Sequence, residues 1–302
     1  MTDDTAGDPM GCLKWTRKST YTISHELRKR KIQASPNTTS KLLKRLGYSL
    51  KTNRKEIAET RHPDRNRQFE VIALKKSRFE ELGQPIISVD SKKKELVGNF
   101  SHPGRTWCID PEMVYNHDFR STAIGIANPY GIFEPMTNMG TVVVGVSYDT
   151  PEFAVESIVL WMKRSGLKRY PSMTELLIFC DAGGSNSCRA RVWKYSIYKK
   201  ICRAFGITVT VCHYPTGASK WNPVDHRLFS FISQNWAGVP LRSYEIVLEY
   251  IQSTTTELDL RVKAILNKKK YEKGVKISDR QMRKINIKKN DVLPQWNYII
   301  SP

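Results

Sequence analysis

Leu176-Leu177-Ile178-Phe179-Cys180-Asp181 is the stretch that decides the fold, because five apolar residues run without interruption into an aspartate. A short apolar run of this kind is typical of a strand that is covered on both faces of a parallel or mixed sheet. A second run, from Pro85 to Val89, also ends in an aspartate, Asp90. Ligands of such sheets collect at the carboxyl ends of the strands. Both aspartates are therefore expected at the ligand-binding edge of one sheet.

The segments around these runs predict strands first and then strands alternating with helices. Strands are expected at 86–90, 130–133, 141–148, 176–181 and 207–212, with 94–100 as a hairpin partner of the first. Helices are expected at 151–166, at about 187–205 with Gly206 as C-cap, and at 223–232. This order predicts an α/β fold with a mixed sheet and helices on its faces. Crossover helices make the later strands parallel to their neighbours.

A third aspartate, Asp225, lies near the start of the helix expected at 223–232. At 100° per residue it falls on the apolar side of that helix, where a carboxylate is costly unless it is paired or metal-bound. Capping is the competing interpretation: with Asn222 as N-cap and Pro223 at N1, Asp225 is at N3, where the helix dipole favours an acid. Asp90 and Asp181 can likewise start turns. The three together are more specific than any one of them.

Three clustered carboxylates predict a site for Mg²⁺, for which Mn²⁺ can substitute, because phosphodiester chemistry needs such a cluster. Asp90, Asp181 and Asp225 are therefore the expected catalytic and metal-binding residues. Lys220 and Arg227 flank the third acid and are expected to contact DNA phosphates. His226 is a candidate proton shuttle or phosphate contact, or only a polar-face residue. Sequence motifs of P-loop enzymes, zinc proteases and serine hydrolases are absent.

The charge of the chain predicts a polyanionic partner. Its 49 Lys and Arg residues against 29 Asp and Glu give a net charge of +20. Residues 1–70 carry a net charge of +8 and residues 251–302 a net charge of +7, so that the excess is concentrated at the two ends. Neutralising phosphates releases counterions from DNA, which favours binding. A basic surface that only confers solubility is the alternative interpretation.

Residues 1–55 predict an all-α helix-turn-helix domain. One helix is expected at 21–31, and Ser35-Pro36 opens a second that runs to Leu46 and is closed by Gly47. Leu42, Leu43 and Leu46 are expected to form its buried stripe, with Thr38 and Thr39 one turn earlier. Its outward face suits a DNA major groove. The expected DNA contacts on that face are Asn37, Ser40, Lys41, Lys44 and Arg45. A solvated face on an ordinary helix pair is the alternative.

Cysteines and hydropathy give weaker information. None of the six cysteines forms a C-x-x-C pair, and they are expected to be reduced. A zinc site formed by Cys188, Cys202, Cys212 and His213 is conceivable, but the spacing of these residues matches no standard zinc site. We find no apolar run long enough for a membrane span and no signal peptide at the start. A cytoplasmic, nucleoid-associated protein without a membrane partner is therefore expected.

Several blocks of the sequence together resemble the Rhodopirellula-type DDE transposases of bacterial insertion sequences. The block 89–100 resembles the signature around the first acid of that family, and 181–186 resembles the signature around its second acid. The segments 212–222 and 226–231 resemble the block around its third acid. The blocks 7–10, 46–50, 62–65 and 296–298 extend the resemblance over nearly the whole chain.

The resemblance implies an RNase H-like catalytic fold over residues 85–302, preceded by a basic linker and helix at 56–84 and including a basic C-terminal extension. It also implies Mg²⁺-dependent cleavage and strand transfer at the ends of the element, with Asp90, Asp181 and Asp225 as the triad. Terminal repeats and target DNA are the implied partners, and pairing of two DNA ends implies a homodimer or higher assembly.

The sequence departs from the family pattern in two ways. The third acid is usually glutamate, whereas this chain has Asp225, whose side chain is one methylene shorter. Family members usually carry further N-terminal helical sequence, so a truncated copy is also an expectation. An inactive remnant that only binds DNA is therefore the first alternative to an active transposase. A nuclease without strand-transfer activity is the second.

Overall fold

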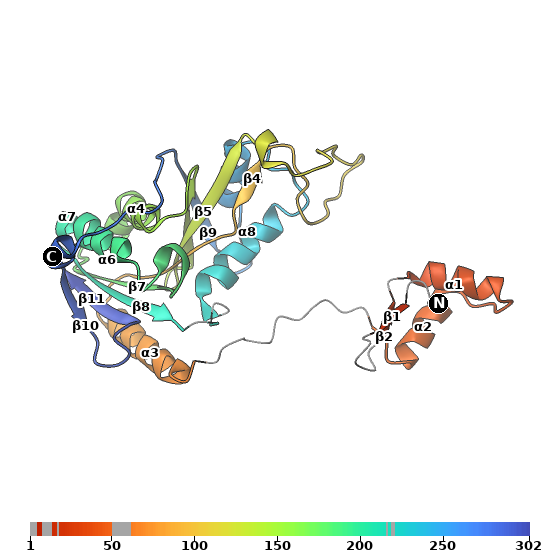
Figure 1. Cartoon of the computed structure of the whole chain (residues 1–302), viewed down its shortest axis with the longest axis horizontal. Helices are drawn as coiled ribbons and strands as arrows, with labels where there is room; N and C mark the ends of the chain where they lie inside the picture. Colours follow the sequence, from red (N-terminus) through yellow and green to blue (C-terminus); the bar gives the residue numbers. More distant parts are fainter. Residues whose placement is uncertain (1–4, 8–13, 17, 50–61, 216, 219–220) are drawn as a thin grey trace. The chain divides into compact units, whose positions relative to one another are not determined.

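The computed structural model describes residues 5–7, 14–16, 18–49, 62–215, 217–218 and 221–302 (Figure 1). The chain forms two compact units, residues 1–57 and 58–302. The helix at 65–81, which the sequence grouped with the linker, belongs to the second unit and packs on its sheet. Within the described residues, no helix combines the length and the hydropathy needed to cross a membrane.

The first unit contains two short helices and a small hairpin, so the prediction of an all-α domain over residues 1–55 is wrong in this respect. The hairpin pairs β1 (Thr5–Gly7) with β2 (Lys14–Thr16), and the helices are α1 (Thr20–Lys29) and α2 (Pro36–Arg45). Ser35 caps α2 as predicted, because its hydroxyl accepts a hydrogen bond of 3.1 Å from the amide of Thr38. Gly47 follows α2 with a φ of +82°, a conformation that favours glycine.

The predicted buried stripe of α2 is wrong. Leu42 is 44% exposed and Leu46 is 72% exposed, whereas Thr39 is buried at 2%. Leu43 is only half-buried and Thr38 is exposed. The residues of α1 that are buried are Ile23 and Ser24. Two short helices bury only the line along which they meet, so that a stripe as wide as the leucines cannot be covered by α1 alone.

The second unit is built on one mixed sheet with the order β10-β11-β8-β7-β3-β5-β6-β9, and β4 pairs with β5 beside this path. Neighbours β3, β7 and β8 are parallel, as are β6 and β9, and the other pairs are antiparallel. The strands are β3 Ile86–Ser91, β4 Glu95–Val97, β5 Gly125–Glu134, β6 Met139–Gly145, β7 Glu175–Asp181, β8 Thr208–Tyr214, β9 Arg261–Asn267, β10 Asn286–Lys289 and β11 Asn297–Ser301.

Helices cover both faces of this sheet (Figure 1). One face packs against α4 (Pro151–Trp161) and against α6 (Arg191–Ile197), which continues through a π-helical turn, Tyr198–Cys202, into α7 (Arg203–Phe205). The other face packs against α3 (Arg65–Glu81) and against a helix that opens with the π-helical turn Asp225–Phe229 and continues as α8 (Ser230–Asn235). Helix α9 (Tyr244–Gln252) extends this second layer.

Smaller helical segments complete the unit. Helix α4 runs through the π-helical turn Met162–Gly166 into α5 (Leu167–Arg169), and α10 spans Asp279–Met282. Single 3₁₀ turns occupy Arg120–Thr122 and Gly184–Asn186. Gly206 ends α7 in the left-handed conformation, with a φ of +69°, as predicted.

The mixed sheet and the alternation of strands and helices are confirmed, with two corrections. The segment at 94–100 is not a hairpin partner of the first strand, because β4 pairs with β5 and β3 lies between β5 and β7. In addition, the basic C-terminal residues contain sheet strands that the sequence analysis did not predict. Strand β9 extends one edge of the sheet and β10 and β11 extend the other.

Candidate active site

Two of the three predicted aspartates lie at the ends of neighbouring parallel strands. Val89 of β3 is in register with Cys180 of β7, so the residues that follow them, Asp90 and Asp181, lie at the same edge of the sheet. Side chains alternate along a strand, so residues two or four positions apart lie on one face. Ile86, four residues before Asp90, and Leu177, four residues before Asp181, both pack in the cluster under α3, so the two aspartates lie on that face of the sheet. The sequence pattern therefore predicted their proximity correctly.

The helix that carries Asp225 lies directly against the strand next to Asp90. Gly131 of β5 is the register partner of Asp90. A Cβ atom at Gly131 would lie 2.6 Å from Phe229 and 2.9 Å from Val224, so that only glycine leaves room for this helix. Gly140 on the neighbouring strand has the same relation to Leu228, at 2.5 Å. These glycines form a shallow seat that holds the helix close to the first acid.

Asp225 is the first residue of the π-helical turn, whose wider winding is completed when the amide of Ser230 donates to the carbonyl of Asp225. Single π-helical turns in helices frequently occur at functional sites. The Asp225 side chain is half-buried, which agrees with its predicted place on the apolar side of the helix. The neighbouring His226 and Arg227 are exposed.

The three carboxyl groups interact electrostatically. Burial, followed by the charge of Asp181, raises the pKa of Asp90 to about 8. Burial and the charge of Asp225 raise the pKa of Asp181 to about 6, and burial raises the pKa of Asp225. A site that resists holding its own negative charge favours a bound cation, because the cation removes the repulsion between the carboxylates.

Asn222 belongs to the site, although its position in the sequence predicts only a helix cap. Its Nδ2 donates a hydrogen bond of 3.2 Å to Oδ1 of Asp181, and its Oδ1 accepts a hydrogen bond from the hydroxyl of Ser88. The side chain is fully buried. It therefore ties together β3, β7 and the start of the third-acid helix, instead of capping that helix. Its position three residues before Asp225 is the only signal of this role in the sequence.

His213 supports Asp181 from behind. It is fully buried, and its Nδ1 donates a hydrogen bond of 3.0 Å to the backbone carbonyl of Asp181. Its Nε2 accepts from the hydroxyl of Tyr298 at 3.0 Å, and that hydroxyl accepts from the indole of Trp193 at 3.0 Å. Burial lowers the pKa of His213 to about 4, so the ring is neutral at pH 7. This chain of hydrogen bonds fixes the end of β7.

The zinc site considered from the sequence is not assembled. Both ring nitrogens of His213 are occupied by hydrogen bonds, and the thiol of Cys202 donates to the carbonyl of Ile300. Among the residues that the structure describes, no group of three or more His, Cys, Asp and Glu side chains could hold one metal ion. This result includes the three aspartates, which do not form a closed three-ligand set around a single ion. Mg²⁺ usually takes only one or two protein carboxylates and completes its shell with waters and phosphate oxygens, so this donor set fits it.

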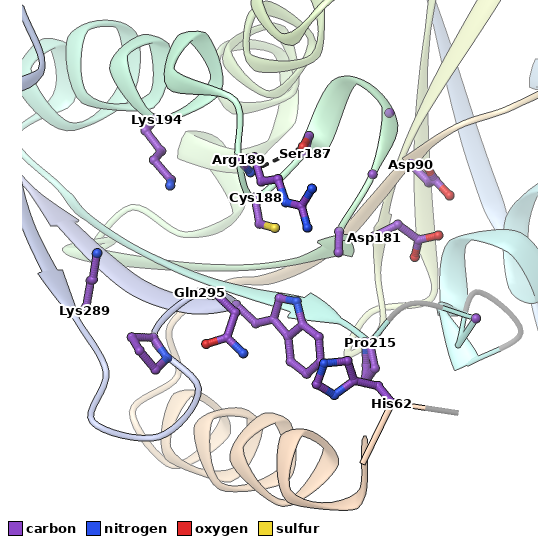
Figure 2. A pocket seen from close by; sticks show the side chains of 16 residues that line it. His62, Asp90, Asp181, Ser187, Cys188, Arg189, Lys194, Pro215, Lys289 and Gln295 are labelled. Carbon is purple, nitrogen blue, oxygen red and sulfur yellow. Dashed lines mark hydrogen bonds between the residues drawn. The ribbon is translucent and has the colours of Figure 1, made fainter. Parts of the chain in front are cut away.

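A cavity of about 910 Å³ opens beside the first two aspartates (Figure 2). Asp90 and Asp181 lie at one end of it, and Lys194 and Lys289 lie at the other, with Arg189 between them. Asp225 does not line this cavity. Bare backbone at Gly183 and Gly184 forms part of the wall, and a Cβ atom at either position would meet open space.

The predicted DNA contacts are distributed over both units. Asn37, Lys41, Lys44 and Arg45 are exposed on α2 and Ser40 is half-buried there. Lys220 lies outside the described residues. Arg227 is brought against the turn between β5 and β6, where its guanidinium donates to Asn138 at 2.9 Å and lies 4.9 Å from the ring centre of Phe133.

A comparison with protein families identifies the chain. The Rhodopirellula transposase DDE domain matches residues 1–302. The chain belongs to this family of transposases. The resemblance drawn from its acidic blocks is thereby confirmed, and the match spans both structural units.

Solved structures with a similar chain trace include those of the Mos1 transposase. The paired-end complex with the left transposon end has a TM-score of 0.42 at 15% identity, with 81% of this chain and 73% of that chain covered. A pre-cleavage Mos1 transpososome has a TM-score of 0.44 at 14% identity, with the same coverage. The Mos1 strand transfer complex has a TM-score of 0.44 at 13% identity and covers 78% and 64%. A search of curated proteins returns no match.

Proposed function

We propose that this chain is an active transposase of a bacterial insertion sequence, which cleaves DNA ends and joins them to a target. The observation that carries the proposal is that Asp90 and Asp181 lie at the same edge of the sheet and that the helix of Asp225 packs against the strand beside Asp90. The three aspartates are carried by two parallel strands and by a helix that packs on Gly131. Burial raises the pKa of all three carboxyl groups, and the charge of a neighbouring aspartate raises the pKa of Asp90 and Asp181 further, as expected of a divalent-cation site.

Asp90, Asp181 and Asp225 would hold Mg²⁺, or Mn²⁺ in its place. Bound there, the cation would activate a water or a 3′-hydroxyl and stabilise the leaving oxygen. Other residues of the chain would hold the acids in position: Asn222 orients the carboxylate of Asp181, and His213 holds the backbone of Asp181. Errors of about 1 Å in such a site can cost on the order of 100-fold in rate.

We assign recognition of the terminal repeats to the first unit. Helix α2 presents Asn37, Lys41, Lys44 and Arg45 on its exposed surface, and Ser40 lies beside them. An amide, a hydroxyl and several cations can bind base edges and phosphates in a major groove. In this division of labour, residues 1–55 recognise the DNA, the segment before α3 links, and residues 85–302 carry out the chemistry together with α3, which packs on their sheet.

Assembly on DNA as a homodimer or larger complex is part of the proposal. The loop between β4 and β5 carries Trp107, Ile109 and Met113 with exposures of 106%, 101% and 82%. Residues 101–124 have a net charge of −1 in a chain whose net charge is +20. Exposed apolar side chains in a loop without a net positive charge favour a protein partner over DNA, and a second copy offers a basic surface.

One observation favours a second candidate, a DNA-binding protein that does not cleave. Asp225 is shorter than the glutamate usual in the family and does not line the cavity with the other two acids. The two functions differ in one assay. DNA that flanks the reading frame is incubated with Mg²⁺ or Mn²⁺ and the wild-type chain or Asp181→Asn.

An active transposase cuts this DNA, and Asp181→Asn binds it but does not cut it. Binding without a cut by either protein would support the second candidate. A target duplex is then added to DNA whose cut end carries a free 3′-hydroxyl. A transposase joins this end to the target, whereas a nuclease does not.

A further inference from the structure

The cavity beside Asp90 and Asp181 contains a cluster of unneutralised positive charge. Arg189, Lys194 and Lys289 all line it. In the part of the chain covered by the structure, none of their charged groups has an ion-pair or hydrogen-bond partner. Lys194 is half-buried, and its ammonium group lies 5.1 Å from the ring centre of Tyr298. Three cations that share one cavity without an acid between them favour an anion at that place.

The charged form of Lys194 is disfavoured at its position in the cavity. Burial lowers its pKa, and the charge of Lys289 lowers it further. The two side chains reach into the cavity from α6 and from β10, elements on opposite sides of it (Figure 2). A phosphate between them would accept hydrogen bonds from both sides and relieve the repulsion.

The cavity also contains an aromatic pair close to the acids. His62 and Trp296 lie in the same wall with their ring centres 4.7 Å apart at an angle of 64°. His62 retains 37% exposure of its side chain, so that its ring is accessible to a base. Grooves that combine cations for the backbone with aromatic rings for the bases are typical of single-strand binding.

The volume of the cavity limits the size of the ligand that it can hold. At about 910 Å³ the cavity is in the range of ordinary ligand pockets, which is too small for a duplex but wide enough for a short stretch of one strand. The glycines of the 181–186 turn let a backbone approach closely at the end near the acids. Lys194 and Lys289 lie at the other end with Arg189 on the way, so a strand that leaves the cleaved bond would pass the aromatic pair and reach the lysines.

We propose that this cavity binds the single-stranded DNA next to the cleaved phosphate, with Arg189, Lys194 and Lys289 on its phosphates and with His62, which packs on the buried Trp296, against a base. The inference rests on the proposed DNA-cleaving function, since it assigns one strand of that substrate to a site. It adds a requirement that the acids alone do not impose: the duplex opens beside the cut.

The test measures binding of fluorescent (dT)₁₂ and of a blunt 12-base-pair duplex to the full chain in EDTA, where cleavage cannot occur. The variant is Lys194→Gln with Lys289→Gln. The control is Lys199→Gln with Lys284→Gln, which removes the same charge from exposed residues of neighbouring segments outside the cavity.

The cavity variant is expected to bind (dT)₁₂ roughly tenfold more weakly and to reduce the salt slope by about 1.4, which corresponds to two phosphate contacts on a single strand. The control is expected to change both values by less than about half as much. Blunt-duplex binding should change little in either variant. Equal losses in variant and control, or unchanged (dT)₁₂ binding in the cavity variant, would overturn the proposal.

A second measurement locates the strand directly. Oligonucleotides that carry 4-thiothymidine are crosslinked to the wild-type chain and digested with trypsin. The expected product includes the peptide 290–302, which contains Trp296. Crosslinks confined to peptides outside the cavity would also refute the site. Because binding is measured without metal, its failure leaves the nuclease proposal intact, and a failure of cleavage alone leaves the strand site intact.

Discussion

Replacing Asp90 by asparagine should stabilise the metal-free protein. Burial and the charge of Asp181 raise the pKa of Asp90 from an ordinary 3.8 to about 8. Each pKa unit corresponds to about 1.4 kcal/mol, and relaxation of the site reduces the electrostatic cost, so at pH 7.5 the gain should be roughly 2 to 5 kcal/mol. Asparagine keeps an oxygen that can accept the 2.7 Å hydrogen bond now donated by the amide of Ser91.

The sign of the pH dependence follows from proton binding. Between pH 4 and pH 8 the folded wild-type chain keeps a proton on Asp90 that the unfolded chain loses, because the pKa is about 8 in the folded state and 3.8 in the ordinary one. The free energy of unfolding of the wild type therefore falls as pH rises through this range. The advantage of Asp90→Asn should be absent below about pH 4, grow between these values and stay constant above pH 8.

Urea unfolding followed by tryptophan fluorescence measures this difference, because six of the seven tryptophans belong to residues 58–302. The matched control is Asp118→Asn, which removes an exposed carboxylate and should leave stability unchanged. Mg²⁺ should raise the stability of the wild type and narrow the gap to Asp90→Asn. A variant that is no more stable than the wild type at pH 7.5, or whose advantage does not vary with pH, would refute the electrostatic account of the site.

Three further outcomes are expected. Gly131→Val should displace the third-acid helix, destabilise the protein by about 1–3 kcal/mol in urea unfolding and lower cleavage more than DNA binding, and full cleavage would count against the seat. His213→Leu should remove the hydrogen bonds that this ring makes with the carbonyl of Asp181 and the hydroxyl of Tyr298 and cost about 1–3 kcal/mol each, so a variant as stable as the wild type in the same titration would contradict the network. Trp107→Ser with Ile109→Ser should reduce the mass of the DNA complex in light scattering without loss of fold, and an unchanged mass would remove this loop from the assembly.

The positions of the first two acids could be predicted from the sequence because uninterrupted apolar runs define buried parallel strands. Asp90 and Asp181 follow such runs, and the register of β3 on β7 brings them together. The pattern was weaker where strands lie at the edges of the sheet. Strand β9 has exposed residues in its first half and β10 is largely exposed, so neither carries a continuous apolar run. Their pairing depends on distant partners that composition does not reveal.

The contacts behind the acids could not be predicted for a related reason. Asn222 was expected to cap a helix, a local role, but its hydrogen bonds run to Ser88 and Asp181 on two distant strands. His213 likewise connects a neighbouring strand to Tyr298 near the end of the chain. For the leucines of α2 the prediction of burial is wrong. Their helical spacing leads to burial only where a partner surface exists, and Leu42 and Leu46 are exposed. Local patterns define elements, whereas these roles depend on which elements meet.

The most direct test of the central claim is cleavage of the flanking DNA by a series at the third acid: wild type, Asp225→Asn and Asp225→Glu, with DNA binding measured in parallel. The account predicts that Asp225→Asn loses cleavage by at least about 100-fold while it still binds DNA, and that Asp225→Glu cuts at least as well as the wild type. An Asp225→Asn variant that cleaves as fast as a cleaving wild-type chain would show that this residue is not the third acid.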